Sequence, residues 1–219
     1  GVCMATLGPG ATNLITGVAD ANMDHAPLVA IAGQASTNRL HKESHQVLNL
    51  EAMFLPITKY STRIVSPEVI PEIVRKAFKV AQTEKTGACF IEFPENIAEM
   101  EIDDAPLRVK HATPPEPAAE YIERAAELIS NAENPIILAG NGVIRANAAK
   151  ALTEFAEKLG IPVANTFMAK GVIPFGHPMS LGSVGLQSND YVNTGFANAD
   201  VIICIGYDMV EYHPYLWHP

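Results

Sequence analysis

The chain has 219 residues, of which 48% are hydrophobic and 18% charged, so it is too apolar for a disordered segment. Its 24 acidic and 15 basic residues give a net charge of −9. That balance argues against nucleic acid and against a membrane surface as partners, because both select basic proteins. No apolar stretch approaches the roughly 20 residues that a membrane-spanning helix needs. The length fits one large domain or two small ones.

The three cysteines, Cys3, Cys89 and Cys204, are too few and too scattered for a disulfide framework. Each lies in an apolar run, so we expect buried free thiols in a reducing compartment. The N-terminus has no signal-peptide pattern, which favours a cytoplasmic location. The chain begins at Gly1 without an initiator methionine and ends at Pro219 inside an aromatic stretch. We therefore expect a fragment of a longer protein.

Short apolar runs alternate with amphipathic stretches along the chain. The expected strands are residues 2–7, 27–33, 88–93, 135–140, 162–166 and 201–206. They lack polar–apolar alternation, which is typical of strands buried on both faces of a parallel sheet. Apolar residues recur every three or four positions in the expected helices, residues 67–84, 118–130 and 146–159, with Gly160 as the C-cap of the last. The alternation predicts an α/β fold with parallel sheets flanked by helices.

The apolar periodicity stops over residues 101–118. Pro114, Pro115 and Pro117 favour extended, linker-like backbone in this stretch. We therefore place a domain boundary here, with about 100 residues on each side.

A glycine-rich turn, Gly8-Pro9-Gly10, follows the first expected strand and precedes a helix-compatible run over residues 14–21. Glycines beside a proline let the backbone turn sharply and approach a ligand. Thr12 or Asn13 is the candidate cap of the following helix. Taken alone, the motif is also compatible with an ordinary strand-to-helix turn.

A second turn, Ala139-Gly140-Asn141-Gly142, follows the strand at 135–138. A strand, a Gly-x-Gly turn and a helix resemble a nucleotide-binding βα unit. The third glycine of that motif is missing, and Arg145 stands in its place. Tight packing between strand and helix is the alternative role for these glycines.

Three further polar residues are ordinary when each is taken alone: Gln34 at a strand end, Gln46 in a loop, and Lys59 near an expected surface. The sequence contains no zinc-ligand spacing, no Gly-x-Ser-x-Gly elbow and no Walker A motif. The sequence therefore gives no support to a zinc site, to a serine hydrolase or to a P-loop nucleotide-binding protein.

In order and spacing, these segments resemble the thiamine-diphosphate-dependent enzymes of the acetolactate synthase and pyruvate oxidase group. The matching stretches are residues 7–21, 24–34, 45–46, 56–59 and 87–94. The resemblance implies that residues 1–100 are the C-terminal part of the pyrimidine-binding domain. It also implies a linker over 101–118 and a truncated Rossmann-like central domain over 119–219.

The same resemblance implies roles for single residues. It assigns Gly8, Pro9, Gly10 and Asn13 to the turn that packs beside the cofactor. Gln46 matches a glutamine near thiamine diphosphate, and Gln34 matches one that approaches the active centre. Lys59 matches a lysine at the substrate channel, where its charge attracts a 2-keto acid carboxylate. No metal ligand is expected in this chain.

The implied activity is that of acetolactate synthase, which condenses two pyruvates to 2-acetolactate with loss of CO₂. The implied cofactors are thiamine diphosphate and Mg²⁺, and the implied pathway is branched-chain amino acid biosynthesis. The implied assembly is a homodimer or homotetramer. By this comparison the family's catalytic Glu lies before residue 1 and the diphosphate domain is missing, so the 219 residues alone are expected to be inactive.

Several alternatives to this activity remain. Glyoxylate carboligase, pyruvate oxidase and sulfoacetaldehyde acetyltransferase are the enzymatic alternatives within the family. A non-enzymatic nucleotide-binding or interaction module is the alternative from another class.

The resemblance also bears on a flavin cofactor. Gly206-Tyr207-Asp208 lacks the arginine of FAD-binding synthases, and the stretches 39–46 and 59–61 resemble FAD-independent, catabolic enzymes. Residues 32–34 and 168–171 instead resemble the FAD-dependent branch. We expect the FAD-independent type.

Overall fold

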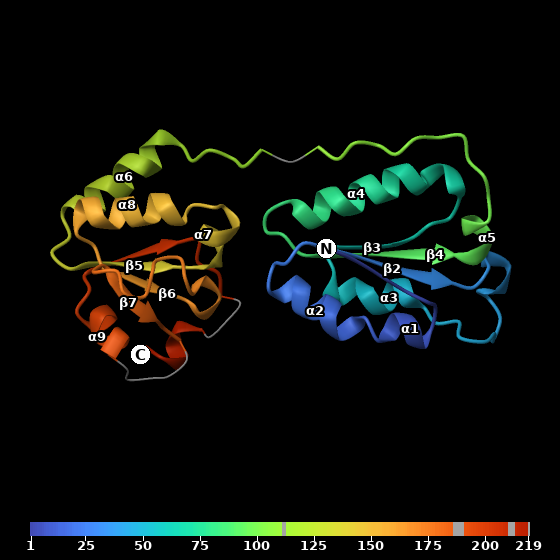
Figure 1. The fold of residues 1–219 in the computed structure, drawn as a ribbon, viewed down its shortest axis with the longest axis horizontal. Coiled ribbons are helices and arrows are strands. Elements are labelled where there is room, and N and C mark those ends of the chain that lie inside the picture. Colours follow the sequence, from blue (N-terminus) through green and yellow to red (C-terminus); the bar gives the residue numbers. More distant parts are fainter. Residues whose placement is uncertain (111–112, 186–190, 210–212, 219) are drawn as a thin grey trace. The chain divides into compact units, whose positions relative to one another are not determined.

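The computed structural model describes residues 1–110, 113–185, 191–209 and 213–218. The chain divides into two units, Gly1–Pro115 and Glu116–Pro219. Each unit is built on its own four-stranded parallel sheet with helices on its faces (Figure 1). The predicted α/β class is confirmed. The described part of 101–118 contains neither helix nor strand. Within the described ranges, no helix is long and apolar enough to cross a membrane.

The first unit orders its strands β1-β2-β4-β3, all parallel. The strands are β1 (Val2–Ala5), β2 (Leu28–Gln34), β3 (Tyr60–Arg63) and β4 (Ala88–Pro94). The helices are α1 (Pro9–Thr12), α2 (Ile15–Met23), α3 (Leu50–Phe54), α4 (Ile70–Gln82) and α5 (Glu95–Ala98). Helix α4 covers one face of the sheet, and α1, α2 and α3 lie on the other (Figure 1). Because the strands are parallel, all four carboxyl ends meet at one edge.

Apolar packing on both faces of this sheet holds the edge in place. On the α3 face, the fully buried rings of Phe54 and Phe90 stack with their centroids 3.8 Å apart. On the α4 face, Ile91 packs with Ala77 and Ala81, which belong to the apolar stripe predicted for this helix. Burying aromatic side chains of this size dominates the energetics of a small core. The strand ends are therefore rigidly placed.

The second unit orders its strands β7-β6-β5-β8, again all parallel. The strands are β5 (Pro135–Ala139), β6 (Val163–Asn165), β7 (Ser180–Ser183) and β8 (Val201–Ile205). The helices are α6 (Ala119–Ser130), α7 (Asn141–Arg145), α8 (Ala149–Leu159) and α9 (Tyr191–Ala197). The expected helix at 146–159 thus begins three residues later, after the short helix α7. The predicted C-cap at Gly160 is confirmed by its left-handed φ of 68°.

Two features of the sheets differ from the sequence-based expectation. Strands β3 and β7 were not predicted, because each has only four residues and both are rich in small polar side chains. Burial on both faces is correct for β4 and β5 but wrong for β1 and β8. Each of these two strands has a neighbour on one side only, and Met4 and Ile202 are 72% and 44% exposed.

The predicted caps at Thr12 and Asn13 are also wrong. Helix α1 begins at Pro9, with Gly8 as its N-cap, and α2 begins at Ile15 after Leu14. The Thr12 hydroxyl instead donates to the Pro9 carbonyl at 3.0 Å. The helix starts inside the motif because proline's fixed φ suits the first helical position.

The thiols differ from one another in burial. Cys89 is fully buried, Cys3 is half-buried and Cys204 is exposed, so the expectation of buried thiols holds for Cys89 alone. Cys204 is exposed because its side chain lies on the same face of β8 as Ile202, and both positions on that face are exposed. Burial raises the pKa of the Cys89 thiol from its ordinary value near 9 to about 11.

This pKa shift predicts a loss of stability at alkaline pH. The native state keeps the Cys89 proton that the unfolded chain loses near pH 9, so the contribution is complete below pH 9 and falls as pH rises toward 11. Urea unfolding at pH 8 and pH 10 measures the decline, and Cys89→Ala should make it smaller. An equal decline in wild type and Cys89→Ala would contradict the prediction.

Candidate functional site

The turn after β1 meets the loop after β2 at the carboxyl edge of the first sheet. Gly8 is buried and has φ 56° and ψ −121°. A Cβ at this position would lie 2.7 Å from both the Cβ and the carbonyl oxygen of Gln46. Gln46 itself has a left-handed φ of 59°, which is uncommon outside glycine. The structure thus brings these two predicted site residues into direct contact.

The other residues of the turn lie on helix α1. Pro9 is the first residue of the helix, and Gly10 packs against the Thr6 side chain. Asn13 follows the helix and is exposed, as is Gln46. A side-chain amide both donates and accepts hydrogen bonds. This edge therefore offers exposed neutral amides beside a close-packed glycine turn.

Gln34, the last residue of β2, is 1% exposed. Its Nε2 donates to the Leu48 carbonyl at 2.8 Å and to Glu92 Oε1 at 2.7 Å. Its Oε1 accepts from the Ala35 N–H at 2.9 Å. The amide is thus fully engaged within the unit and joins β2 to β4 and to the loop before α3.

Glu92 on β4 is completely buried, and four hydrogen bonds reach its carboxylate. Oε1 accepts from Gln34 Nε2 and from Arg63 Nε at 2.9 Å. Oε2 accepts from the Glu51 N–H at 3.1 Å and from Arg63 Nη2 at 3.4 Å. A buried charge persists only when it is paired and hydrogen-bonded, and here both conditions hold.

Sequence reasoning missed both Glu92 and Arg63. The available signal was the acidic residue within the otherwise apolar strand 88–93, because such a charge requires a partner. The identity of the partner was not readable, since Arg63 lies on a short strand that the apolar pattern did not reveal.

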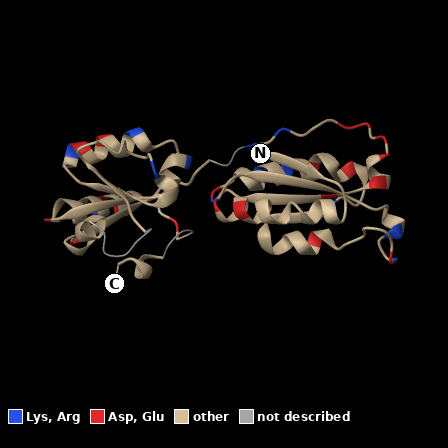
Figure 2. Cartoon of the chain, turned by 60° about the horizontal axis from the view of Figure 1, so that its bottom comes forward, with Lys and Arg blue, Asp and Glu red and all other residues tan. Residues whose placement is uncertain are grey.

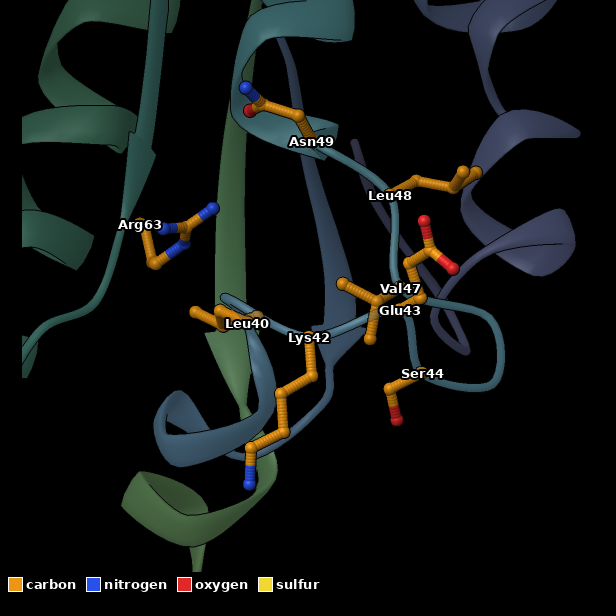
Figure 3. A pocket seen from close by; sticks show the side chains of 8 residues that line it. All are labelled: Leu40, Lys42, Glu43, Ser44, Val47, Leu48, Asn49 and Arg63. Atoms are coloured by element: carbon orange, nitrogen blue, oxygen red, sulfur yellow. The ribbon is translucent and has the colours of Figure 1, made fainter.

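A pocket of about 590 Å³ opens beside this network (Figure 3). Arg63 lines it from the end of β3 and points toward β4. The other lining residues come from the loop between β2 and α3: Leu40, Lys42, Glu43, Ser44, Val47, Leu48 and Asn49. None of the predicted site residues lines this pocket, although Gln46 directly precedes Val47.

Lys59 precedes β3 and therefore lies at the amino edge of the sheet, opposite Gly8 and Gln34. Its Nζ donates to the carbonyl oxygens of Val80, Thr83 and Lys85 at 2.8, 2.6 and 2.5 Å. These carbonyls lie at and beyond the C-terminal end of α4, where orphan acceptors attract cations. Burial lowers the pKa of Lys59. The structure does not bring Lys59 together with the other predicted site residues.

Replacing Lys59 by methionine should therefore lower stability by about 1–2 kcal/mol, because a charged donor to several carbonyls is lost. Urea unfolding measures this, with Lys150→Met as control, since the Lys150 side chain is 91% exposed and makes an i,i+4 ion pair of the kind that contributes little to stability. Unchanged stability together with a raised KM for pyruvate would assign Lys59 to the substrate channel instead.

In the second unit the two glycine turns pack against each other. The Gly142 N–H donates to the Gly206 carbonyl at 2.9 Å. A Cβ on Gly142 would lie 2.8 Å from Gly206 Cα, and Gly206 has φ 60°. The glycines are thus required by close contact between the end of β8 and the start of α7. Residues 210–212, which follow this turn closely in the sequence, lie outside the described part.

The charged side chains in the described part of the chain form no cluster that suggests a metal. Within the described ranges, no group of three or more His, Cys, Asp or Glu residues could hold a metal ion. Figure 2 shows acidic and basic residues dispersed over both units. The feature that stands out chemically is therefore the carboxyl edge of the first sheet.

Comparison with known protein families identifies two domains of one enzyme family in this chain. Residues 1–53 match the family model described as "Thiamine pyrophosphate enzyme, N-terminal TPP binding domain", and residues 122–218 match "Thiamine pyrophosphate enzyme, central domain". The chain belongs to the thiamine pyrophosphate enzyme family. The predicted resemblance is confirmed, and the N-terminal match contains the contact between Gly8 and Gln46.

Among curated relatives, the chain is 40% identical over 213 residues to a probable acetolactate synthase large subunit of Methanocaldococcus jannaschii. It is 37% identical over 213 residues to the acetolactate synthase large subunit of Corynebacterium glutamicum. It is 35% identical over 216 residues to glyoxylate carboligase of Escherichia coli O157:H7. These matches cover 94%, 94% and 97% of this chain and 36%, 34% and 36% of the relatives. The chain thus spans about a third of their length.

Proposed function

We propose that the whole protein is a thiamine-diphosphate- and Mg²⁺-dependent carboligase of the acetolactate synthase type. It condenses two pyruvates to 2-acetolactate with loss of CO₂. The observation that supports this best is the contact between Gly8 and Gln46, at the carboxyl edge of a sheet within the matched TPP-binding domain. Glyoxylate carboligase is the second candidate, because that relative is only slightly less similar.

The residues at this edge fit the aminopyrimidine of the cofactor. A neutral heterocycle with donor and acceptor atoms is matched by exposed amides such as Gln46 and Asn13. Pro9 has no N–H, the Gly10 N–H is already bonded to the Leu7 carbonyl, and residues 8–13 include no lysine or arginine, so the turn offers few donors to a diphosphate. We therefore assign Gly8, Pro9, Gly10, Asn13 and Gln46 to the ring, and the diphosphate, Mg²⁺ and catalytic Glu to parts of the protein beyond these 219 residues.

Thiamine diphosphate supplies the carbanion chemistry that joins two keto acids. The chain's own residues orient the ring. Gly8 lets the turn approach the loop closely enough for the Gln46 main chain to seat against it. Gln34 positions Gln46 indirectly, because its buried side-chain amide donates to the Leu48 carbonyl in the loop that also contains Gln46. Preorganised groups of this kind avoid reorganisation during the reaction.

The proposal is tested by incubating the full-length protein with thiamine diphosphate, Mg²⁺ and pyruvate and then measuring acetoin after acid decarboxylation. We expect product from the full-length protein and none from the 219-residue chain. Carboligation of glyoxylate without reaction of pyruvate would select the second candidate. Absence of thiamine diphosphate binding would contradict both.

The same proposal includes a homodimer or homotetramer, because family active sites form between subunits. Light scattering of the full-length protein measures this directly. An active monomer would contradict it.

We further propose that the central domain binds no FAD. The Gly142 N–H already donates to the Gly206 carbonyl, and both glycines are needed for close packing. This N–H is therefore not available to bind a phosphate of FAD. Full-length protein from a flavin-replete host should be colourless, and added FAD should leave its melting temperature unchanged. A flavin absorbance band at near-stoichiometric occupancy would contradict this.

A further inference from the structure

The loop between β2 and α3 is tied to the sheet by two buried side chains. Gln34 Nε2 holds the Leu48 carbonyl at 2.8 Å. Glu92 Oε2 holds the Glu51 N–H at 3.1 Å, at the first turn of α3. Gln34 and Glu92 are also bonded to each other at 2.7 Å. The two ties thus form one unit that clamps the main chain two and five residues after Gln46.

Gln46 needs such a clamp. Its left-handed φ of 59° is an unfavourable conformation for a residue with a side chain, and it persists only where the surroundings impose it. Its main-chain carbonyl also faces Gly8 closely enough that a single methyl group would not fit. Without the hydrogen bonds to Leu48 and Glu51, the loop would relax and Gln46 would move away from Gly8.

The carboxylate at position 92 is chemically required for the clamp. Each of its four hydrogen-bonding partners is a donor: Gln34 Nε2, the Glu51 N–H, and Arg63 Nε and Nη2. An ionised carboxylate accepts all four bonds, whereas a glutamine would turn its NH₂ group toward a donor on one side. Arg63 supplies the opposite charge, so the buried carboxylate is compensated.

We propose that Glu92 is a positioning residue that acts through Gln34 and the main chain of residues 48–51 to hold Gln46 against Gly8. It thereby sets the affinity of the protein for the aminopyrimidine of thiamine diphosphate. This rests on the proposed function for the identity of the ligand. The clamp itself rests on the hydrogen bonds and on burial.

The test is Glu92→Gln in the full-length protein. The thiamine diphosphate concentration for half-maximal binding, measured by equilibrium dialysis, should rise about tenfold, while kcat at saturating cofactor stays within about twofold of wild type. Hydrogen exchange measured by mass spectrometry should accelerate in peptides covering residues 46–51 and not in those covering α4. A merely structural role would lower the melting temperature and leave the half-saturating concentration unchanged.

Glu123→Gln is the matched control, because it removes the same charge from an exposed site on α6 and should change neither readout. If Glu92→Gln does not fold, Glu92→Asp keeps the acceptor chemistry with a shorter reach. It should then raise the half-saturating concentration about threefold. Wild-type affinity in the folded variant, or unchanged exchange at 46–51, overturns this inference alone. A wild type that does not bind thiamine diphosphate overturns the proposed function, while the exchange rates still decide whether the clamp exists.

Discussion

Replacing Gly8 by alanine should lower the free energy of unfolding of the first unit by about 2–5 kcal/mol, from backbone strain and overpacking together. The φ of 56° with ψ of −121° belongs to a region that side-chain-bearing residues avoid. The new Cβ would also lie 2.7 Å from the Gln46 carbonyl oxygen, which is backbone and cannot rotate away. Gln46 must then move, so thiamine diphosphate affinity should fall together with stability. Urea unfolding and cofactor titration of the full-length protein measure the two effects.

Gly17→Ala is the matched control for this substitution. Gly17 lies inside helix α2, and a Cβ there would have no neighbour within 4 Å. Alanine is favoured over glycine in a helix by up to about 1 kcal/mol, so this variant should be as stable as wild type or more so. Equal effects of the two substitutions would refute a specific contact between the Gly8 turn and Gln46.

Replacing Arg63 by methionine should cost about 3–5 kcal/mol of stability, because it leaves a buried carboxylate without its counter-charge. Glu92 is fully buried, and Arg63 contributes two of the four donors that reach it. Methionine keeps much of the length of the arginine stem, so the loss reports the charge and hydrogen bonds rather than volume. Denaturant unfolding of the full-length protein gives the magnitude.

Lys150→Met provides the comparison. The ion pair of Lys150 with Glu154 is solvated, with side chains 91% and 64% exposed, and should contribute about 1 kcal/mol or less. The double variant Arg63→Met with Glu92→Gln should be less destabilised than the sum of the single variants, because the uncompensated charge is gone. Strict additivity would show that the two side chains do not act as a pair.

The sequence by itself determined the α/β class, the central strands and the turn at Gly8. These follow from local patterns, since apolar runs and proline beside glycine act within a few residues. The order and spacing of several sequence segments also resemble a known family, and the comparisons confirm membership of that family. The short strands β3 and β7 escaped, because their burial comes from neighbours and not from their own composition.

Only the tertiary structure decided which of the candidate residues meet. Gln34 and Glu92 are 58 residues apart and are joined because β2 and β4 are neighbours in the order β1-β2-β4-β3. Lys59 lies at the opposite edge because it precedes its strand, whereas Gln34 ends one. Strand order arises from how helices and sheet faces pack together over the whole unit. No local sequence pattern predicts the strand order, so the hydrogen bonds of Gln34 and Glu92 that position Gln46 could be identified only from the folded structure.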